Sequence, residues 1–207
     1  MNTDYQTITP KVIENAFTYS EYRALIDRLL LEKKTTGTNH SEAYLDYTAM
    51  NNRRMDRWDK TTKIPSELEE LVAQIQEKQV WLIITEGWCG DAAQNIPFIQ
   101  KLADLSDFVE VRYILRDENI EIMDQYLTNG GRSIPKLIAL NEDLSEEFFT
   151  WGPRPEFLQE RLRQYKLDPQ GVSSADFATG THLWYAKDKN RSLAKEFQTL
   201  ISTYLSK

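Results

Sequence analysis

The 207-residue sequence contains a single cysteine, Cys89, and two histidines. A lone cysteine cannot form an intramolecular disulfide, so a disulfide-stapled scaffold is excluded and nothing requires an oxidising compartment. The histidines, His40 and His182, are isolated in the sequence from each other and from Cys89. No set of metal ligands at a recognisable spacing is visible, and we predict no metal site.

Glycine and proline are also scarce, at 8 and 7 residues, and no internal repeat occurs, which excludes solenoids and disordered low-complexity chains. With 25 basic against 32 acidic residues, the chain lacks the positive surplus that nucleic acids and anionic membranes require of a partner. The most apolar run, 80–84, is too short to cross a bilayer, and the N-terminus does not resemble a secretory signal. We expect a cytoplasmic protein with neither a nucleic-acid nor a membrane partner.

The N-terminal third has helical periodicity. One helix is expected from Thr18, which has capping-box spacing with Glu21, and a second over residues 41–60. A third is expected from Ser66, which has the same spacing with Glu69, to about residue 79. These patterns predict a helical extension over residues 1–65 that leads into the main domain.

From residue 80 the pattern alternates between strand and helix. The run 80–85 is short, apolar and rich in branched residues, as in a strand buried on both faces of a sheet. Strands are expected at 80–85, 109–115, 136–140 and 146–151, and helices at 91–105, 120–127 and 155–165. The order β-α-β-α-β-β-α predicts an α/β fold with a mixed four-stranded sheet over residues 66–166. Residues 167–207 are then a linker, to about residue 180, and a helical tail.

The most informative motif lies where the first strand meets the next helix. It reads Trp88-Cys89-Gly90-Asp91-Ala92, with Pro97 inside the helix and Ile134-Pro135 before the third strand. In this order and spacing the features resemble the thioredoxin superfamily, and within it the thioredoxin-like proteins whose motif is Trp-Cys-Gly-Asp-Cys. The resemblance spans about residues 66–165 and implies a thioredoxin-like fold with helical additions at both ends.

Two departures from that family bear on activity. Ala92 stands where the redox-active members carry their second cysteine, and Ile83 stands where many thioredoxins place a buried acid that serves it. Without a second thiol the chain cannot close a disulfide on itself. We therefore predict that it is not a dithiol oxidoreductase.

Cys89 is the candidate catalytic residue of a monothiol protein. A helix N-terminus favours a thiolate and lowers the pKa of a cysteine, whereas the neighbouring Asp91 opposes that effect. As a nucleophile, Cys89 would exchange with a small thiol or disulfide, with glutathione as a co-substrate, or with a cysteine of a client protein. The alternative is a buried cysteine that serves only as a small hydrophobe. No resident cofactor is expected.

The resemblance also implies a binding groove. It implies a cis peptide bond at Pro135, so that the backbone of Ile134 faces Cys89 and can pair with an extended peptide. Candidate binding residues are Trp88, Gly90, Asp91, Ile134 and Pro135. A redox-inactive module that binds a partner in this groove is therefore an alternative function, and an iron-sulfur carrier with two Cys89 thiolates and two glutathiones across a dimer is a third.

A basic cluster interrupts the acidic chain just before the main domain. It comprises Arg53, Arg54, Arg57, Lys60 and Lys63. Such clusters commonly form solvated faces. If the N-terminal helices fold over the sheet near Cys89, one of the arginines, with Arg53 as the candidate, would bind a thiolate or a carboxylate.

Overall fold

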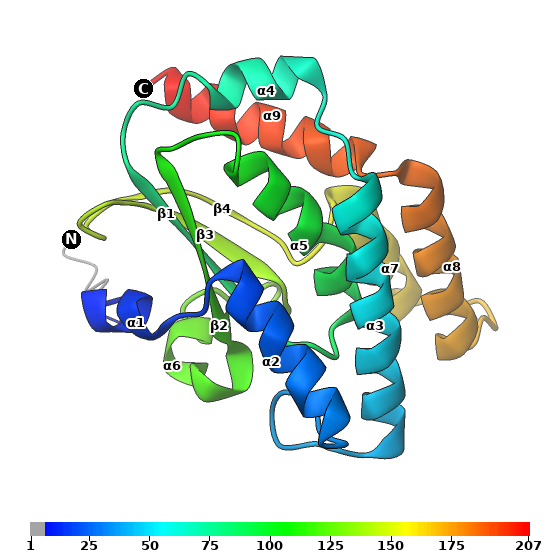
Figure 1. Ribbon diagram of the computed structural model, residues 1–207. Helices are drawn as coiled ribbons and strands as arrows, with labels where there is room; N and C mark the ends of the chain where they lie inside the picture. The colour runs from blue at the N-terminus through cyan, green and yellow to red at the C-terminus, as the bar shows by residue number, and fades with distance from the viewer. Residues whose placement is uncertain (1–6) are drawn as a thin grey trace.

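A mixed four-stranded sheet forms the centre of the computed structural model, which describes residues 7–207 (Figure 1). The strands are β1 (Gln79–Thr85), β2 (Val109–Leu115), β3 (Lys136–Asn141) and β4 (Glu147–Trp151). Their order is β2-β1-β3-β4, with β1 parallel to β2 and antiparallel to β3. Every residue of β1 is buried, as predicted for a central strand covered on both faces.

The helices complete an α/β arrangement in the predicted order. They are α1 (Pro10–Asn15), α2 (Tyr19–Leu31), α3 (Glu42–Thr61), α4 (Ser66–Val72), α5 (Gly90–Ala103), α6 (Ile120–Met123), α7 (Glu156–Leu167), α8 (Ser174–Asp188) and α9 (Arg191–Leu205), with a short 3₁₀ turn at Arg116–Glu118. The thioredoxin-like fold expected from the sequence is confirmed, including the buried Pro97 inside α5. No helix of residues 7–207 is both long and apolar enough to cross a membrane.

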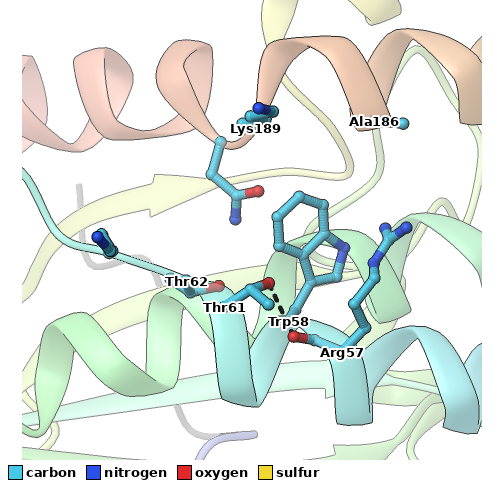
Figure 2. Close-up of a pocket in the computed structure, with 8 residues that line it drawn as sticks. Arg57, Trp58, Thr61, Thr62, Ala186 and Lys189 are labelled. Atoms are coloured by element: carbon cyan, nitrogen blue, oxygen red, sulfur yellow. Dashed lines mark hydrogen bonds between the residues drawn. The ribbon is translucent and has the colours of Figure 1, made fainter.

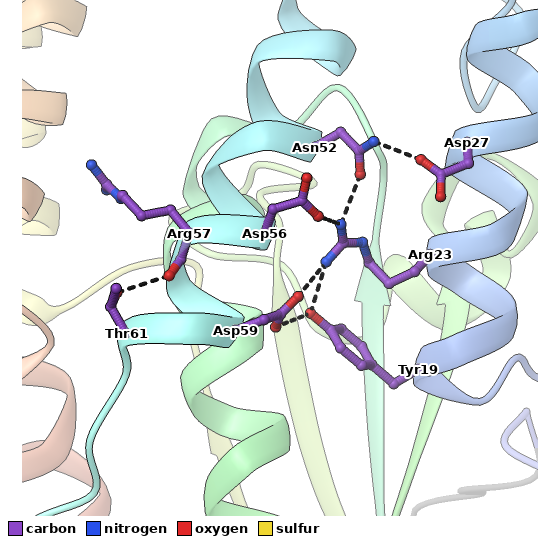
Figure 3. Close-up of polar contacts among 8 residues, drawn as sticks. All are labelled: Tyr19, Arg23, Asp27, Asn52, Asp56, Arg57, Asp59 and Thr61. Atoms are coloured by element: carbon purple, nitrogen blue, oxygen red, sulfur yellow. Dashed lines mark hydrogen bonds and ion pairs between the residues drawn. The ribbon is translucent and has the colours of Figure 1, made fainter.

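Within the N-terminal extension, a polar network joins α2 to α3 (Figure 3). The guanidinium of Arg23 on α2 forms ion pairs with Asp56 and, at 2.5 Å, with Asp59 of α3. It also donates to the side-chain oxygen of Asn52 at 2.9 Å. The Arg23 side chain is only 14% exposed, so these partners stabilise a largely desolvated charge and hold α2 in register with α3.

Helices α2 and α4 both begin where the sequence predicts, but only α2 has the predicted cap. Thr18 caps α2 in the predicted capping box with Glu21. In contrast, Ser66 does not cap α4: the N-cap is Pro65, with no side-chain hydrogen bond. The predicted extension of α4 to residue 79 is also wrong, since the helix ends at Val72 while Ile75, in the following turn, is still buried. The apolar pattern thus continues beyond the hydrogen-bonded helix.

Two other boundaries also differ from the prediction. The helix expected at 120–127 is the single turn α6, which ends at Met123. Much of the expected linker to residue 180 belongs instead to α8, which begins after Ser173 caps it. The expected linker ended at Gly180, but this glycine lies inside the helix, where an added Cβ would be 2.8 Å from the guanidinium of Arg161 on α7. The glycine therefore permits helix packing, which its sequence context does not reveal.

Candidate functional site

Cys89 occupies the junction between β1 and α5. It is the N-cap residue of α5, and its Sγ accepts the backbone N–H of Ala92 at 3.5 Å. The same sulfur donates its proton to the carbonyl oxygen of Ile134 at 3.2 Å. Cys89 is 8% exposed, and one sulfur atom thus connects the start of the helix with the loop before β3.

Burial dominates the acidity of this thiol. The pKa of Cys89 is raised from 9.0 to about 12, first by burial and second by the nearby charge of Asp91, while the backbone N–H groups of Ala92 and Asp91 act to lower it. The sequence led us to expect a lowered pKa from the helix N-terminus, and the structure reverses that expectation. The helix donors are present, but they are outweighed because the packed chain excludes water from the sulfur.

Asp91 ties the motif to the C-terminal part of the chain. Its carboxylate forms an ion pair with Arg154 at 2.6 Å and accepts the hydroxyl proton of Tyr185 at 2.7 Å. The two charged side chains are only 14% and 16% exposed. Burial raises the pKa of Asp91, and the guanidinium opposes that shift. Of these three residues, Asp91 comes from α5, Arg154 from the segment before α7 and Tyr185 from α8.

Helices α3 and α8 both approach the motif at Gly90. A Cβ placed on Gly90 would lie 3.1 Å from Cε1 of His182 on α8 and 3.9 Å from Nη1 of Arg54 on α3. Burial, together with the charge of Arg54, lowers the pKa of His182 to about 4, so this imidazole is neutral at physiological pH. Arg53, the arginine proposed from the sequence, is exposed, and Arg54 is the one that approaches the motif.

Trp88, the residue before the cysteine, contacts an aromatic and a basic side chain. Its ring centroid lies 5.4 Å from that of Tyr44 on α3, and the guanidinium of Arg116 stands 4.8 Å from the ring centroid. Asn51, also on α3, donates to the carbonyl oxygen of Gly87 at 3.3 Å. Helix α3 of the N-terminal extension therefore packs directly on the segment that carries the cysteine.

The loop before β3 contains the cis peptide bond Ile134–Pro135, and a second cis bond joins Gly152 to Pro153. Gly152 has a φ of 114°, and a Cβ there would lie 2.2 Å from the carbonyl oxygen of Pro135. Only glycine lets these two segments approach so closely. Of the residues predicted to bind a partner, Ile134 and Pro135 are buried, whereas Trp88, Gly90 and Asp91 are partly exposed.

A groove of about 400 Å³ does lie beside this loop, displaced toward α7. The cis-proline loop, the segment before α7 and α7 itself supply its walls. The lining residues are Thr128, Asn129, Gly131, Ser133, Pro153, Arg154, Gln159, Leu162, Arg163, Lys166 and Leu167. Arg154 thus links the groove to Asp91, two residues from Cys89.

Several residues around the motif were not singled out as site residues from the sequence. Glu86, three residues before Cys89, is fully buried and accepts the backbone N–H of Asp117 at 2.9 Å, and burial raises its pKa. Arg154 and His182 reach the motif from distant segments, so no local spacing could reveal them. Tyr185 also comes from a distant segment, and its only local signal is the adjacent aromatic residue Trp184, since such pairs commonly pack a helix on a core. Within residues 7–207, no three His, Cys, Asp or Glu side chains gather as metal ligands.

Comparisons with known proteins agree with this arrangement. A thioredoxin family model matches residues 37–166, more than half of the chain. A protein of unknown function from Pseudomonas aeruginosa has a similar structure, with a TM-score of 0.55 and 16% sequence identity over 90% of this chain and 98% of its own. An HIV epitope scaffold is similar to this chain at a TM-score of 0.53 and 16% identity, over 90% of this chain and 99% of its own.

No curated protein matches the sequence significantly. The two structural matches, at 16% identity, support the fold alone. The family match begins at residue 37 and so includes α3, the helix that packs on the cysteine motif. With the sheet order, the cysteine at the N-terminus of α5 and this match together, the chain belongs to the thioredoxin family.

Proposed function

We propose that the protein is a redox-inactive thioredoxin-fold module, which binds an extended segment of a partner protein in the groove beside Pro135. The observation that carries the proposal is the state of Cys89. Its thiol is 8% exposed and donates to the Ile134 carbonyl oxygen, and burial raises its pKa to about 12. Since the thiolate is the reactive form, a thiol held protonated does not exchange at neutral pH.

The composition of the groove supports an acidic and apolar partner segment. Lys166 places positive charge on its α7 wall, where Arg163 is paired with Glu160, and Leu162 and Leu167 add apolar surface. Leu167 is 75% exposed, so a large part of this apolar surface is available to a partner.

Selection of peptides tests the proposal. Random 12-residue peptides displayed on phage are selected against the reduced protein, and the best binder is titrated calorimetrically. We expect an acidic peptide with apolar residues, whose affinity falls at least about tenfold in Lys166→Glu and in Leu167→Ser. Lys187→Glu, which makes the same charge change at an exposed site on α8, is the matched control and should bind normally.

Cys89→Ser distinguishes binding from thiol chemistry. Serine also caps helix N-termini, so the variant should fold and bind the selected peptide with unchanged affinity. Failure to select any peptide, or selected peptides that bind Lys166→Glu and Leu167→Ser as well as the parent, would refute the groove as the binding site.

A second function, mixed-disulfide formation by a monothiol, is favoured by one feature. The Ala92 N–H points at Sγ from 3.5 Å and would stabilise a thiolate. Incubation with oxidised glutathione followed by intact-mass measurement separates the two functions. The binding module forms no adduct under native conditions and a complete one after unfolding, whereas the monothiol protein accumulates a one-to-one adduct while folded.

A further inference from the structure

A second pocket lies away from Cys89, where the C-terminal end of α3 meets the turn between α8 and α9 (Figure 2). Its volume is about 390 Å³. Figure 2 shows Arg57, Trp58 and Thr62 on the α3 side, facing Ala186 and Lys189. The complete lining is Arg57, Trp58, Thr61, Thr62, Lys63, Ala186, Lys189 and Asn190. Arg57 and Lys63 belong to the basic cluster noted in the sequence, and the proposed partner groove uses neither.

All the charged residues that line this pocket are positive. Arg57, Lys63 and Lys189 line it, and its lining contains no acidic residue. Among the described residues, none of these three cations forms an ion pair, although the chain as a whole has a net charge of -7. Arg23, by contrast, is neutralised by two carboxylates of the same helix α3. Three uncompensated cations around one cavity favour an anionic occupant.

Two buried polar atoms in the same lining lack partners. Asn190 is 7% exposed and Thr62 is 5% exposed. Neither Nδ2 of Asn190 nor Oγ1 of Thr62 has a hydrogen bond within the described part of the chain. A buried polar group without a partner is destabilising, so such groups are rare unless a ligand or water satisfies them. An amide N–H and a hydroxyl are donors, and both can bind the oxygen atoms of an anion.

The position of Asn190 explains why its side chain is free. It is the N-cap residue of α9, yet it has a φ of 62° and makes no capping hydrogen bond. The side-chain oxygen of an asparagine at the N-cap position ordinarily accepts a backbone N–H of the first helical turn. Here Asp188 takes over that role from Asn190: its carboxylate accepts the backbone N–H of Ser192, in the first turn of α9, at 3.1 Å.

The walls of the pocket are held in place. The Trp58 indole N–H donates to Oε1 of Gln94 on α5 at 2.7 Å, and the Arg57 guanidinium lies 4.7 Å from the Trp58 ring centroid. Lys101 donates to the Thr62 carbonyl oxygen at 2.8 Å, which partly neutralises the negative end of α3. A ligand would therefore meet a site that is already formed, with little ordering entropy to lose.

We propose that this pocket binds a small oxyanion with at least two negative charges, whose oxygen atoms accept from Asn190 and Thr62 while Arg57, Lys63 and Lys189 supply the charge. The chemistry is that of a phosphate or polycarboxylate group on a small molecule. The site is independent of the partner groove, since the two share no lining residue.

Calorimetric titration at constant ionic strength tests the proposal with three probes: inorganic phosphate, pyrophosphate and citrate. We expect one-to-one, saturable binding with a Kd below about 1 mM for at least one of them, weakened by added sodium chloride. Binding of the phosphates alone identifies the ligand class as phosphorylated, and equal binding of citrate identifies it as polycarboxylate. Absence of saturable binding by all three probes would overturn the proposal.

Substitutions of the lining residues test whether the anion binds in this pocket. Asn190→Asp keeps the size of the side chain and tolerates a positive φ, but it replaces a donor with a negative charge, and the affinity should fall at least about tenfold. Asn190→Gly retains the backbone conformation and should lower the affinity about threefold or more. Thr62→Val preserves the side-chain shape while removing the hydroxyl, and should act similarly.

The matched control is a lysine three residues away. Lys63→Gln should weaken binding about fivefold, whereas Lys60→Gln, an exposed lysine of α3 that does not line the pocket, should leave it within about twofold. Circular dichroism establishes that each variant is folded before titration. Equal losses in Lys60→Gln and Lys63→Gln, or unchanged binding in Asn190→Asp and Thr62→Val, would show that the anion binds elsewhere and refute the assignment.

Discussion

The burial of Cys89 leads us to expect a slow reaction of its thiol with alkylating reagents. Burial raises its pKa from 9.0 to about 12, and the reactive form is the thiolate. At pH 8 an ordinary cysteine is about one-tenth thiolate, whereas a thiol with the raised pKa is ionised in only about one molecule in 10⁴. The folded protein should therefore react with iodoacetamide about 10³-fold more slowly than the unfolded chain, before any steric protection is added.

The assay is the rate of carbamidomethylation measured by intact mass between pH 7 and 10.5. The unfolded protein in guanidinium chloride gives the reference rate, and Cys89→Ser shows that no other side chain is modified. For the folded protein we expect the logarithm of the rate to rise with a slope of about one up to the highest pH, without a plateau. A folded rate within about tenfold of the unfolded rate at pH 8, or a plateau with an apparent pKa below 9, would refute the reasoning.

An equilibrium measurement tests the same pKa. The raised pKa means that the folded state keeps a proton which the unfolded state loses above pH 9, so folding stability falls as pH rises from 9 toward 12. Below about pH 8 the thiol is almost fully protonated in both states and contributes little pH dependence. At pH 10.5 the parent should lose about 2 kcal/mol of unfolding free energy that Cys89→Ser retains. Parallel urea-unfolding curves of the two proteins, with no divergence between pH 8 and 10.5, would contradict this pKa.

Three further predictions concern stability and the missing thiol. Gly152→Ala places a methyl group against the Pro135 carbonyl oxygen, 2.2 Å away, at a φ of 114°, and should lower the urea-unfolding free energy by at least about 3 kcal/mol; a loss under about 1 kcal/mol would show that the loops separate easily. Arg23→Met leaves two α3 carboxylates without their guanidinium and should cost about 1 to 2 kcal/mol in the same assay, a loss that unchanged stability would disprove. Ala92→Cys should form a disulfide with Cys89 on oxidation, because side chains three residues apart at a helix start come within bonding reach, and a mass loss of about 2 Da is the readout; two persistently free thiols would count against that geometry.

Much of the fold was predictable because local patterns and tertiary packing agree. The run 80–85 indicated a central strand from its branched apolar residues alone, and the structure buries every residue of β1. Thr18 with Glu21 likewise predicted the start of α2. The predictions failed where tertiary packing supports a helix that the local pattern does not indicate: the linker expected to reach residue 180 ends where α8 begins, and Gly180 lies inside this helix beside Arg161 of α7.

For the candidate site, too, some properties were predictable from the sequence and others depend on the tertiary structure. The sequence alone determined that the chain has one thiol at a thioredoxin-type strand-to-helix junction, and that Ala92 rules out an internal disulfide there, since both follow from residue identity and order. It could not determine the state of that thiol, because acidity depends on what excludes water from the sulfur. The tertiary structure decided this: α3 and α8 converge on Gly90, Asp91 pairs with Arg154, and Cys89 is buried against the Ile134 carbonyl group. Desolvation by segments remote in sequence therefore outweighs the local field of the helix N-terminus.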